Sequence, residues 1–168
     1  AVIGEENQGW SVLAQALDYQ RVTVSAREAS QSKLYLDTLI KYINETKVNG
    51  KTLAIDPVVR HQVAELFVAS QVSRLFAYRN TWMIDRKMPV DKEAAMSKAW
   101  MTELNQRILS VALQIMGPYG QLQMDSPSAP FDGSMEAKYR GSPMVKFGGG
   151  ANEVQRNIVA ERGLGLPR

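Results

Sequence analysis

The sequence predicts an all-α protein, a four-helix bundle that forms a single domain over residues 1–168. Apolar residues recur at helical spacing over three long segments, while few stretches alternate as a half-buried strand does. Gly and Pro residues fall mainly between those segments, where they end helices. A chain of 168 residues can bury one well-formed core but is short for two domains.

The first helix is predicted from about Gln8 to Lys47. The turn Asn49-Gly50 ends it. Its apolar residues at helical spacing are Trp10, Leu13, Leu17, Val24, Leu36, Leu39, Ile40 and Ile43. A helix of this length is expected to form one wall of a bundle.

The second helix has a clear start, because Asp56 is a good N-cap and Pro57 follows at the first helical position, where its missing N–H costs nothing. It should extend to about Arg86, before Lys87-Met88-Pro89 breaks the run.

The third helix is predicted to be capped by Asp91 and stopped by Gly117-Pro118. Its expected buried stripe is Trp100, Leu104, Ile108, Val111 and Ile115. Residues 119–133 should form a loop, since they are rich in Pro, Ser, Asp and Gly.

The last third of the chain should hold a short helical piece over Ser134–Tyr139, a flexible hinge at Gly148–Gly150, and a closing helix from Asn152 to about Glu161. Asn152 is the predicted N-cap of that closing helix.

Composition and charge exclude several classes of function. The net charge is +3, and Lys and Arg are scattered, so no basic stripe indicates a nucleic-acid partner. No Cys is present, which fits a cytoplasmic protein. No apolar run approaches a membrane span, and no metal site is predicted. Because the chain opens on Ala1 rather than Met, we expect it to be processed or cut from a longer one.

Two motifs in the last third are specific. Gln114–Gly120, read as QIMGPYG, resembles the Q-x-x-G-G-x-G segment of the flavin-dependent acyl-CoA dehydrogenases. Gly148–Arg156, read as GGGANEVQR, resembles the E-G-T-x-E-I-Q-R signature of the same family. Arg140 stands between them, at the position of a recurring family Arg.

The N-terminal part agrees with this family. Gly4–Trp10 is similar to its G-E-x-G-x-G motif that precedes Phe or Trp, Leu17–Arg21 to its L-D-x-x-R motif, and Tyr42–Leu53 to its turn after the first long helix. The match covers nearly the whole chain in order. It implies the C-terminal helical domain, without the N-terminal helical and β-domains that precede it in the family.

The resemblance implies a reaction that needs a carboxylate, and this chain lacks one at the usual positions. The family removes a proton from the acyl α-carbon with a carboxylate, while FAD accepts a hydride from the β-carbon. The usual base position is Gly149, and a minority of the family places the Glu at Gln20. Neither residue can accept that proton. Glu153 is a remaining candidate, although the family signature already has a non-catalytic Glu there.

The implied cofactor and substrate contacts are partly kept. The family's phosphate-binding Arg is replaced by Thr46, a nearby Phe by Asn49, and a Thr near the flavin by Ala151. The candidate FAD-binding residues that remain are Gln114, Gly117, Gly120, Gly150, Glu153 and Lys47. Asp18 and Arg21 stand where relatives contact the acyl-CoA, although their spacing also suits a local ion pair on a helix.

The resemblance leaves three hypotheses. The chain belongs to an acyl-CoA dehydrogenase subunit with a degenerate active site that works in a homo- or hetero-oligomer with a partner. Alternatively, it is part of a homo-oligomeric dehydrogenase with a relocated base, or a non-enzymatic assembly domain that kept the fold. In all three, we expect the isolated chain to be inactive and to bind FAD weakly or not at all.

Overall fold

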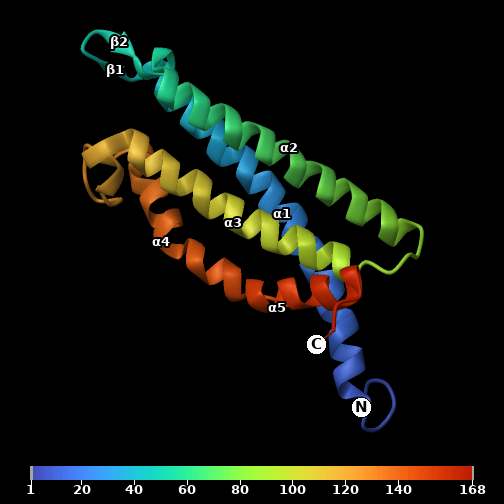
Figure 1. Ribbon diagram of the computed structural model, residues 1–168. Helices are drawn as coiled ribbons and strands as arrows, with labels where there is room; N and C mark the ends of the chain where they lie inside the picture. Colours follow the sequence, from blue (N-terminus) through green and yellow to red (C-terminus); the bar gives the residue numbers. More distant parts are fainter. Residues whose placement is uncertain (1, 168) are drawn as a thin grey trace.

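The computed structural model describes residues 2–167, with the side chain of Asp18 outside the described part. Four long helices form a bundle, and a short fifth closes it (Figure 1). They are α1 (Gly9–Glu45), α2 (Pro57–Asp85), α3 (Asp91–Met116), α4 (Ser134–Phe147) and α5 (Asn152–Ile158). The predicted all-α bundle is therefore confirmed.

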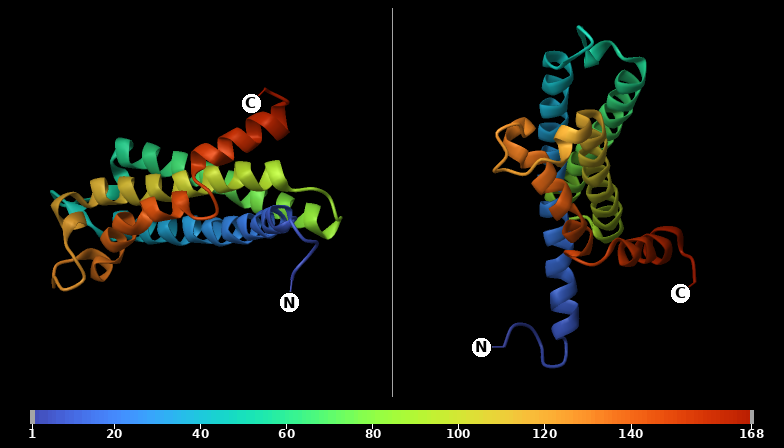
Figure 2. Two further views of the ribbon diagram at one scale, coloured as in Figure 1. Left: turned by 90° about the horizontal axis from the view of Figure 1, so that it is seen from below. Right: turned by 90° about the vertical axis from the view of Figure 1, so that its left-hand side faces the viewer.

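Helix α3 is the centre of the arrangement, because it contacts α1, α2, α4 and α5. Leu39 of α1, Leu66 of α2 and Ile108 of α3 are fully buried where these helices meet. The first turns of α1 extend beyond the other helices (Figure 2), which leaves Trp10 mostly exposed. Trp100 was expected in the buried stripe of α3, but its side chain is 42% exposed.

The start of α2 agrees with prediction, since the Asp56 carboxylate accepts hydrogen bonds from the backbone N–H groups of Val58 (2.8 Å) and Val59 (3.1 Å). The cap of α3 was predicted wrongly. Val90 is its N-cap, and Asp91 lies in the first turn, where its carboxylate accepts a hydrogen bond from Arg162 at 3.0 Å.

The cap of α5 was also predicted wrongly. Ala151 is the N-cap, and Asn152 is the first helical residue. The Asn152 side chain is buried and bonds with Lys98, Thr102 and Glu103 of α3 instead of with its own helix. In both helices, the side chain expected to cap the helix N-terminus bonds instead to residues far away in the sequence.

Two further elements differ from the sequence prediction. Strands β1 (Lys47–Val48) and β2 (Lys51–Thr52) pair as a small hairpin. Asn49 and Gly50 both have positive φ in its turn, as a two-residue hairpin turn requires. Helix α4 continues eight residues past Tyr139 to Phe147.

The extension of α4 passes through Pro143, which lacks the N–H that would bond to the carbonyl of Tyr139. The Ser142 hydroxyl donates to that carbonyl at 2.7 Å. A side chain therefore replaces the missing backbone donor, and the helix continues.

The 3₁₀ segments η1 (Leu53–Ile55), η2 (Gly117–Gln121) and η3 (Pro130–Gly133), and the π-helical turn η4 (Val159–Gly163), connect or extend the helices. Within residues 2–167, no helix is both long enough and apolar enough to cross a bilayer. No group of three or more His, Cys, Asp or Glu side chains suited to a metal ion occurs in the same range.

Candidate functional site

The structure brings together the two positions at which the family resemblance places a catalytic carboxylate. Gly149 follows α4, and Gln20 lies on α1. A Cβ atom added to Gly149 would lie 3.7 Å from Oε1 of Gln20 and 3.9 Å from Cγ of Arg21. Both positions therefore border the same point, and the two side chains present there are hydrogen and an amide.

The segment Gly148–Gly150 is held from several sides, in contrast to the flexible hinge expected from its composition. The Gly149 carbonyl accepts hydrogen bonds from Arg21 Nε and Gln155 Nε2, both at 3.2 Å. The Gly150 carbonyl accepts from Lys98 Nζ at 2.9 Å and from Gln155 Nε2 at 3.1 Å. Donors on α1, α3 and α5 thus fix both carbonyls.

A groove of about 740 Å³ lies against this segment, between the N-terminal half of α1 and the α5–η4 region. Its lining is largely apolar and includes Trp10, Leu17 and Val154. Arg21 borders it as a buried guanidinium. Such a groove suits a partly apolar ligand; Glu161 and Arg162 also line it.

Among the predicted substrate residues, Arg21 therefore lies at the groove. Asp18 lies within α1, but its side chain is outside the described part of the structure. Glu153 is exposed on α5 and is not among the residues that line the groove.

Four of the predicted cofactor residues lie at one end of the bundle. Gln114, Gly117 and Gly120 are at the C-terminal end of α3, the end at which the β1–β2 hairpin carries Lys47 (Figure 1). Lys47 and Gln114 are exposed. Gly120 has a packing reason to be glycine, because an added Cβ would lie 2.6 Å from the carbonyl oxygen of Leu113.

The other two predicted cofactor residues lie elsewhere. Gly150 is bonded to Lys98, and Glu153 is near it on α5. Lys98 and Gln114 are sixteen residues apart on α3, which corresponds to about 24 Å along the helix. Within one copy of the chain, the six residues therefore lie at two separate places.

The replaced family positions lie at helix ends or in a turn. The backbone N–H of Thr46 caps α1 by donating to Tyr42 at 2.9 Å. Asn49 occupies the hairpin turn with φ 52°. Ala151 is the N-cap of α5.

Sequence reasoning missed the residues that hold the glycine segment, namely Lys98 and Gln155. The burial of Lys98 could have been predicted, because position 98 falls on the same face of α3 as the buried residues Ala94 and Met101. A lysine on that face must find acceptors inside the protein.

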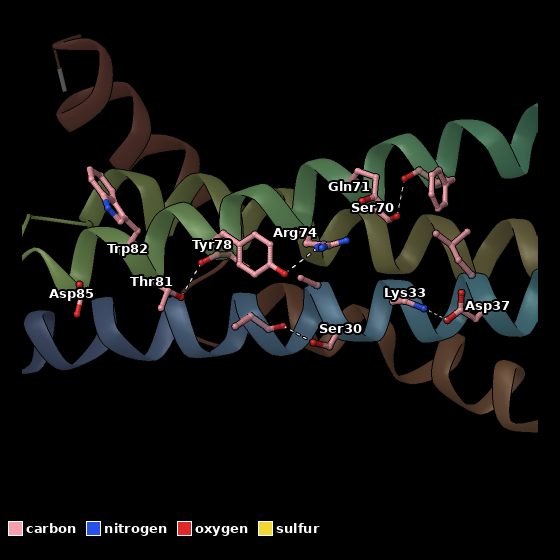
Figure 3. A pocket seen from close by; sticks show the side chains of 15 residues that line it. Ser30, Lys33, Asp37, Ser70, Gln71, Arg74, Tyr78, Thr81, Trp82 and Asp85 are labelled. Atoms are coloured by element: carbon pink, nitrogen blue, oxygen red, sulfur yellow. Dashed lines mark hydrogen bonds and ion pairs between the residues drawn. The ribbon is translucent and has the colours of Figure 1, made fainter.

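A larger groove of about 1010 Å³ lies between α1 and α2 (Figure 3). Phe67, Tyr78 and Trp82 line it, together with the ion pair of Lys33 and Asp37. None of the predicted site residues borders it.

Comparisons with known proteins agree with the fold and the motifs. Residues 7–164 match the family model described as "Acyl-CoA dehydrogenase, C-terminal domain". Acyl-CoA dehydrogenase FadE26 of Mycobacterium tuberculosis is 29% identical over 99% of this chain and 42% of its own length. The caffeyl-CoA reductase-Etf complex subunit CarC of Acetobacterium woodii is 27% identical over 94% of this chain and 40% of its own.

Among solved structures, the Tcur3481-Tcur3483 steroid ACAD superposes with a TM-score of 0.86 at 29% identity, covering 98% of this chain and 41% of that one. The chain thus spans about two fifths of the length of the relatives it matches. From its helices, its motifs and this match, the chain belongs to the acyl-CoA dehydrogenases, a family of flavin-dependent oxidoreductases, as their C-terminal domain.

Proposed function

We propose that this chain is the C-terminal helical domain of an acyl-CoA dehydrogenase subunit whose own position for the catalytic base is empty, and which acts with a partner subunit. The observation that carries the proposal is the meeting of Gln20 and Gly149. A carboxamide and a hydrogen atom cannot accept the α-proton of an acyl thioester at neutral pH. The reaction of this family needs such an acceptor within hydrogen-bond reach.

Substrate binding is proposed for the groove beside these two residues. Its apolar lining suits an acyl or pantetheine chain, and the Arg21 guanidinium supplies a fixed positive charge. Arg21 also donates to the Gly149 carbonyl, so it orders the segment that closes the groove. FAD, when bound by the complete protein, supplies the hydride acceptor.

A partner is supported by the placement of the candidate cofactor residues at two separate places on the chain. Residues about 24 Å apart on one helix can belong to two cofactor sites, each completed by a group from a neighbouring subunit. Relatives agree in kind: CarC is named as a subunit of an Etf complex, and the steroid ACAD is named by two components. Both homo- and hetero-oligomers fit this arrangement.

The two alternative hypotheses, a relocated base and a non-enzymatic assembly domain, require different features of the structure. A relocated base on Glu153 would have to act from α5, at a position where the family signature already has a non-catalytic Glu; like Gln20, Glu153 is exposed and does not line the groove. A non-enzymatic assembly domain would not need the groove, although Arg21 could still hold the Gly149 carbonyl. Both readings remain as alternatives that the experiment distinguishes.

The test is acyl-CoA-dependent bleaching of flavin absorbance in the longest natural form of this protein, alone and with candidate partner subunits. We expect no bleaching by the protein alone and bleaching once the partner is present. Bleaching by the protein alone that survives Glu153→Gln would reveal an unrecognised base and overturn the proposal. Bleaching abolished by Glu153→Gln would assign the base to Glu153. No bleaching and no acyl-CoA binding under any condition would support the assembly domain.

A further inference from the structure

Lys98 is buried to an unusual degree for a lysine, with its side chain among the largest fully buried ones in the described part of the protein. Its ammonium donates to the carbonyls of Lys146 (2.6 Å) and Gly150 (2.9 Å) and to Oδ1 of Asn152 (2.8 Å). An ammonium has three donors, and all three are used. None of the acceptors is a carboxylate.

The three acceptors belong to consecutive parts of the chain. Lys146 lies in the last turn of α4, whose free carbonyls favour a cation. Gly150 ends the glycine segment, and Asn152 begins α5. One side chain on α3 therefore ties together the end of one helix, the glycine segment and the start of the next.

The glycine segment needs such an anchor. Gly149 and Gly150 have φ of 70° and 100°, and glycine has the largest backbone freedom to lose. Gln155 also donates to both carbonyls, but it lies on α5 and moves with the segment. Lys98 and Arg21 are the donors from outside that hold Gly150 and Gly149 in place.

We propose that Lys98 is a positioning residue that holds Gly149 and Gly150 against Gln20 and so keeps the groove formed. The proposal rests on the proposed function only for the groove's ligand, because the holding of the segment can be measured without any ligand. Lys98 does not line the groove, so its action is through the Gly150 carbonyl.

The ammonium of Lys98 loses its proton at a lower pH than an exposed lysine does. Burial and, second, the charge of Arg21 lower its pKa to about 8, against the opposing charges of Glu153 and Glu103. These groups belong to α1, α5 and α3, and Lys146 of α4 faces the ammonium with its carbonyl. If the ammonium contacts the Gly150 carbonyl, the chemical shift of that carbonyl should change as Lys98 loses its proton.

The first measurement needs no variant. In the unsubstituted chain, the carbonyl ¹³C chemical shift of Gly150 should titrate with a midpoint near pH 8, while carbonyls in the middle of α2 stay flat. A Gly150 carbonyl whose chemical shift does not follow the titration of the Lys98 ammonium, whatever its midpoint, would overturn the proposal.

The second measurement compares Lys98→Met with Lys92→Met, which removes the same charge from the same helix without touching the segment. Hydrogen exchange of the Gly150 amide, which bonds to Phe147, should accelerate about tenfold or more in Lys98→Met. It should accelerate little in Lys92→Met. Equal rates in the two variants would contradict the proposal, as would a uniform acceleration over the whole chain.

The third measurement separates this proposal from the proposed function. Binding of an acyl-CoA thioester to the longest natural form should weaken in Lys98→Met and not in Lys92→Met. A loosened segment with unchanged thioester binding would leave the role of Lys98 in place and contradict the assignment of the groove.

Discussion

At the residue scale, Gln20 and Gly149 differ in the backbone conformation that each position imposes. Gly149 has φ 70°, a region that other residues enter only at a cost of about 1–2 kcal/mol. Gln20 lies within a regular α-helix and is exposed, where Gln and Glu have similar helix propensities. The two positions meet in space, but only Gln20 accepts a carboxylate without strain.

This difference predicts opposite outcomes for two ways of restoring the base. Gln20→Glu should change the unfolding free energy by less than about 0.5 kcal/mol, whereas Gly149→Glu should lower it by about 1–2 kcal/mol. In a flavin-loaded natural form, Gln20→Glu should raise the rate of acyl-CoA-dependent bleaching by about 10²–10⁴-fold. Gln15→Glu, on the same helix away from Gly149, is the control. Equal gains from Gln15→Glu and Gln20→Glu would contradict the assignment.

The buried Lys98 predicts a pH dependence of stability with a defined sign. Its pKa is lowered to about 8 in the folded chain, against about 10.4 when unfolded. Between these values the unfolded chain binds more protons, so stability rises with pH. We expect the unfolding free energy of the unsubstituted chain, relative to Lys98→Met, to rise by up to about 3 kcal/mol from pH 8 to 10.4. Urea denaturation across this range measures it, and a difference that falls with pH would refute the sign.

At the element scale, the sequence predicted a helix cap correctly where the cap is made by residues adjacent in the chain. Asp56 was recognised as a cap because its partners are the next residues along the chain. Asp91 and Asn152 were assigned wrongly because Arg162 and Lys98, distant in sequence, compete for their side chains. The juxtaposition of Gln20 with Gly149 could come from the family resemblance alone, since no local pattern relates two segments so far apart.

Helix α4 shows the same limit in another form. Pro143 looks like a helix breaker in the sequence, and the Ser142 hydroxyl that compensates for it is one residue away. Ser142→Ala should therefore lower the unfolding free energy by about 0.5–1.5 kcal/mol, because the part-buried Tyr139 carbonyl loses its donor. The exposed Ser128→Ala serves as the control, with an expected change within about 0.5 kcal/mol. Thermal or urea denaturation of both variants decides it, and equal effects would remove Ser142 from this role.

At the scale of the whole molecule, the candidate cofactor residues are divided between two places on one elongated bundle. We therefore expect the isolated chain to purify without stoichiometric flavin. Added FAD should show no saturable change in fluorescence at micromolar protein. A yellow chain carrying one flavin per copy would contradict this expectation.

The outer face of α2 predicts self-association of the isolated chain. Val68 and Leu75 lie seven residues apart on this face, with side chains 65% and 66% exposed, and Trp100 of α3 is exposed beside Val68. Contiguous apolar surface of this kind marks an interface, and a symmetric pair of chains would bury it against itself.

The test is sedimentation of the chain over a range of concentrations. We expect concentration-dependent dimers or larger species, and we expect Leu75→Glu to shift the equilibrium toward monomer without lowering the unfolding free energy of that monomer. Lys41→Gln, which changes the net charge by the same amount on exposed α1 surface, should leave association unchanged. A strict monomer at millimolar concentration would contradict this prediction and leave the apolar face of α2 without a second copy as its partner.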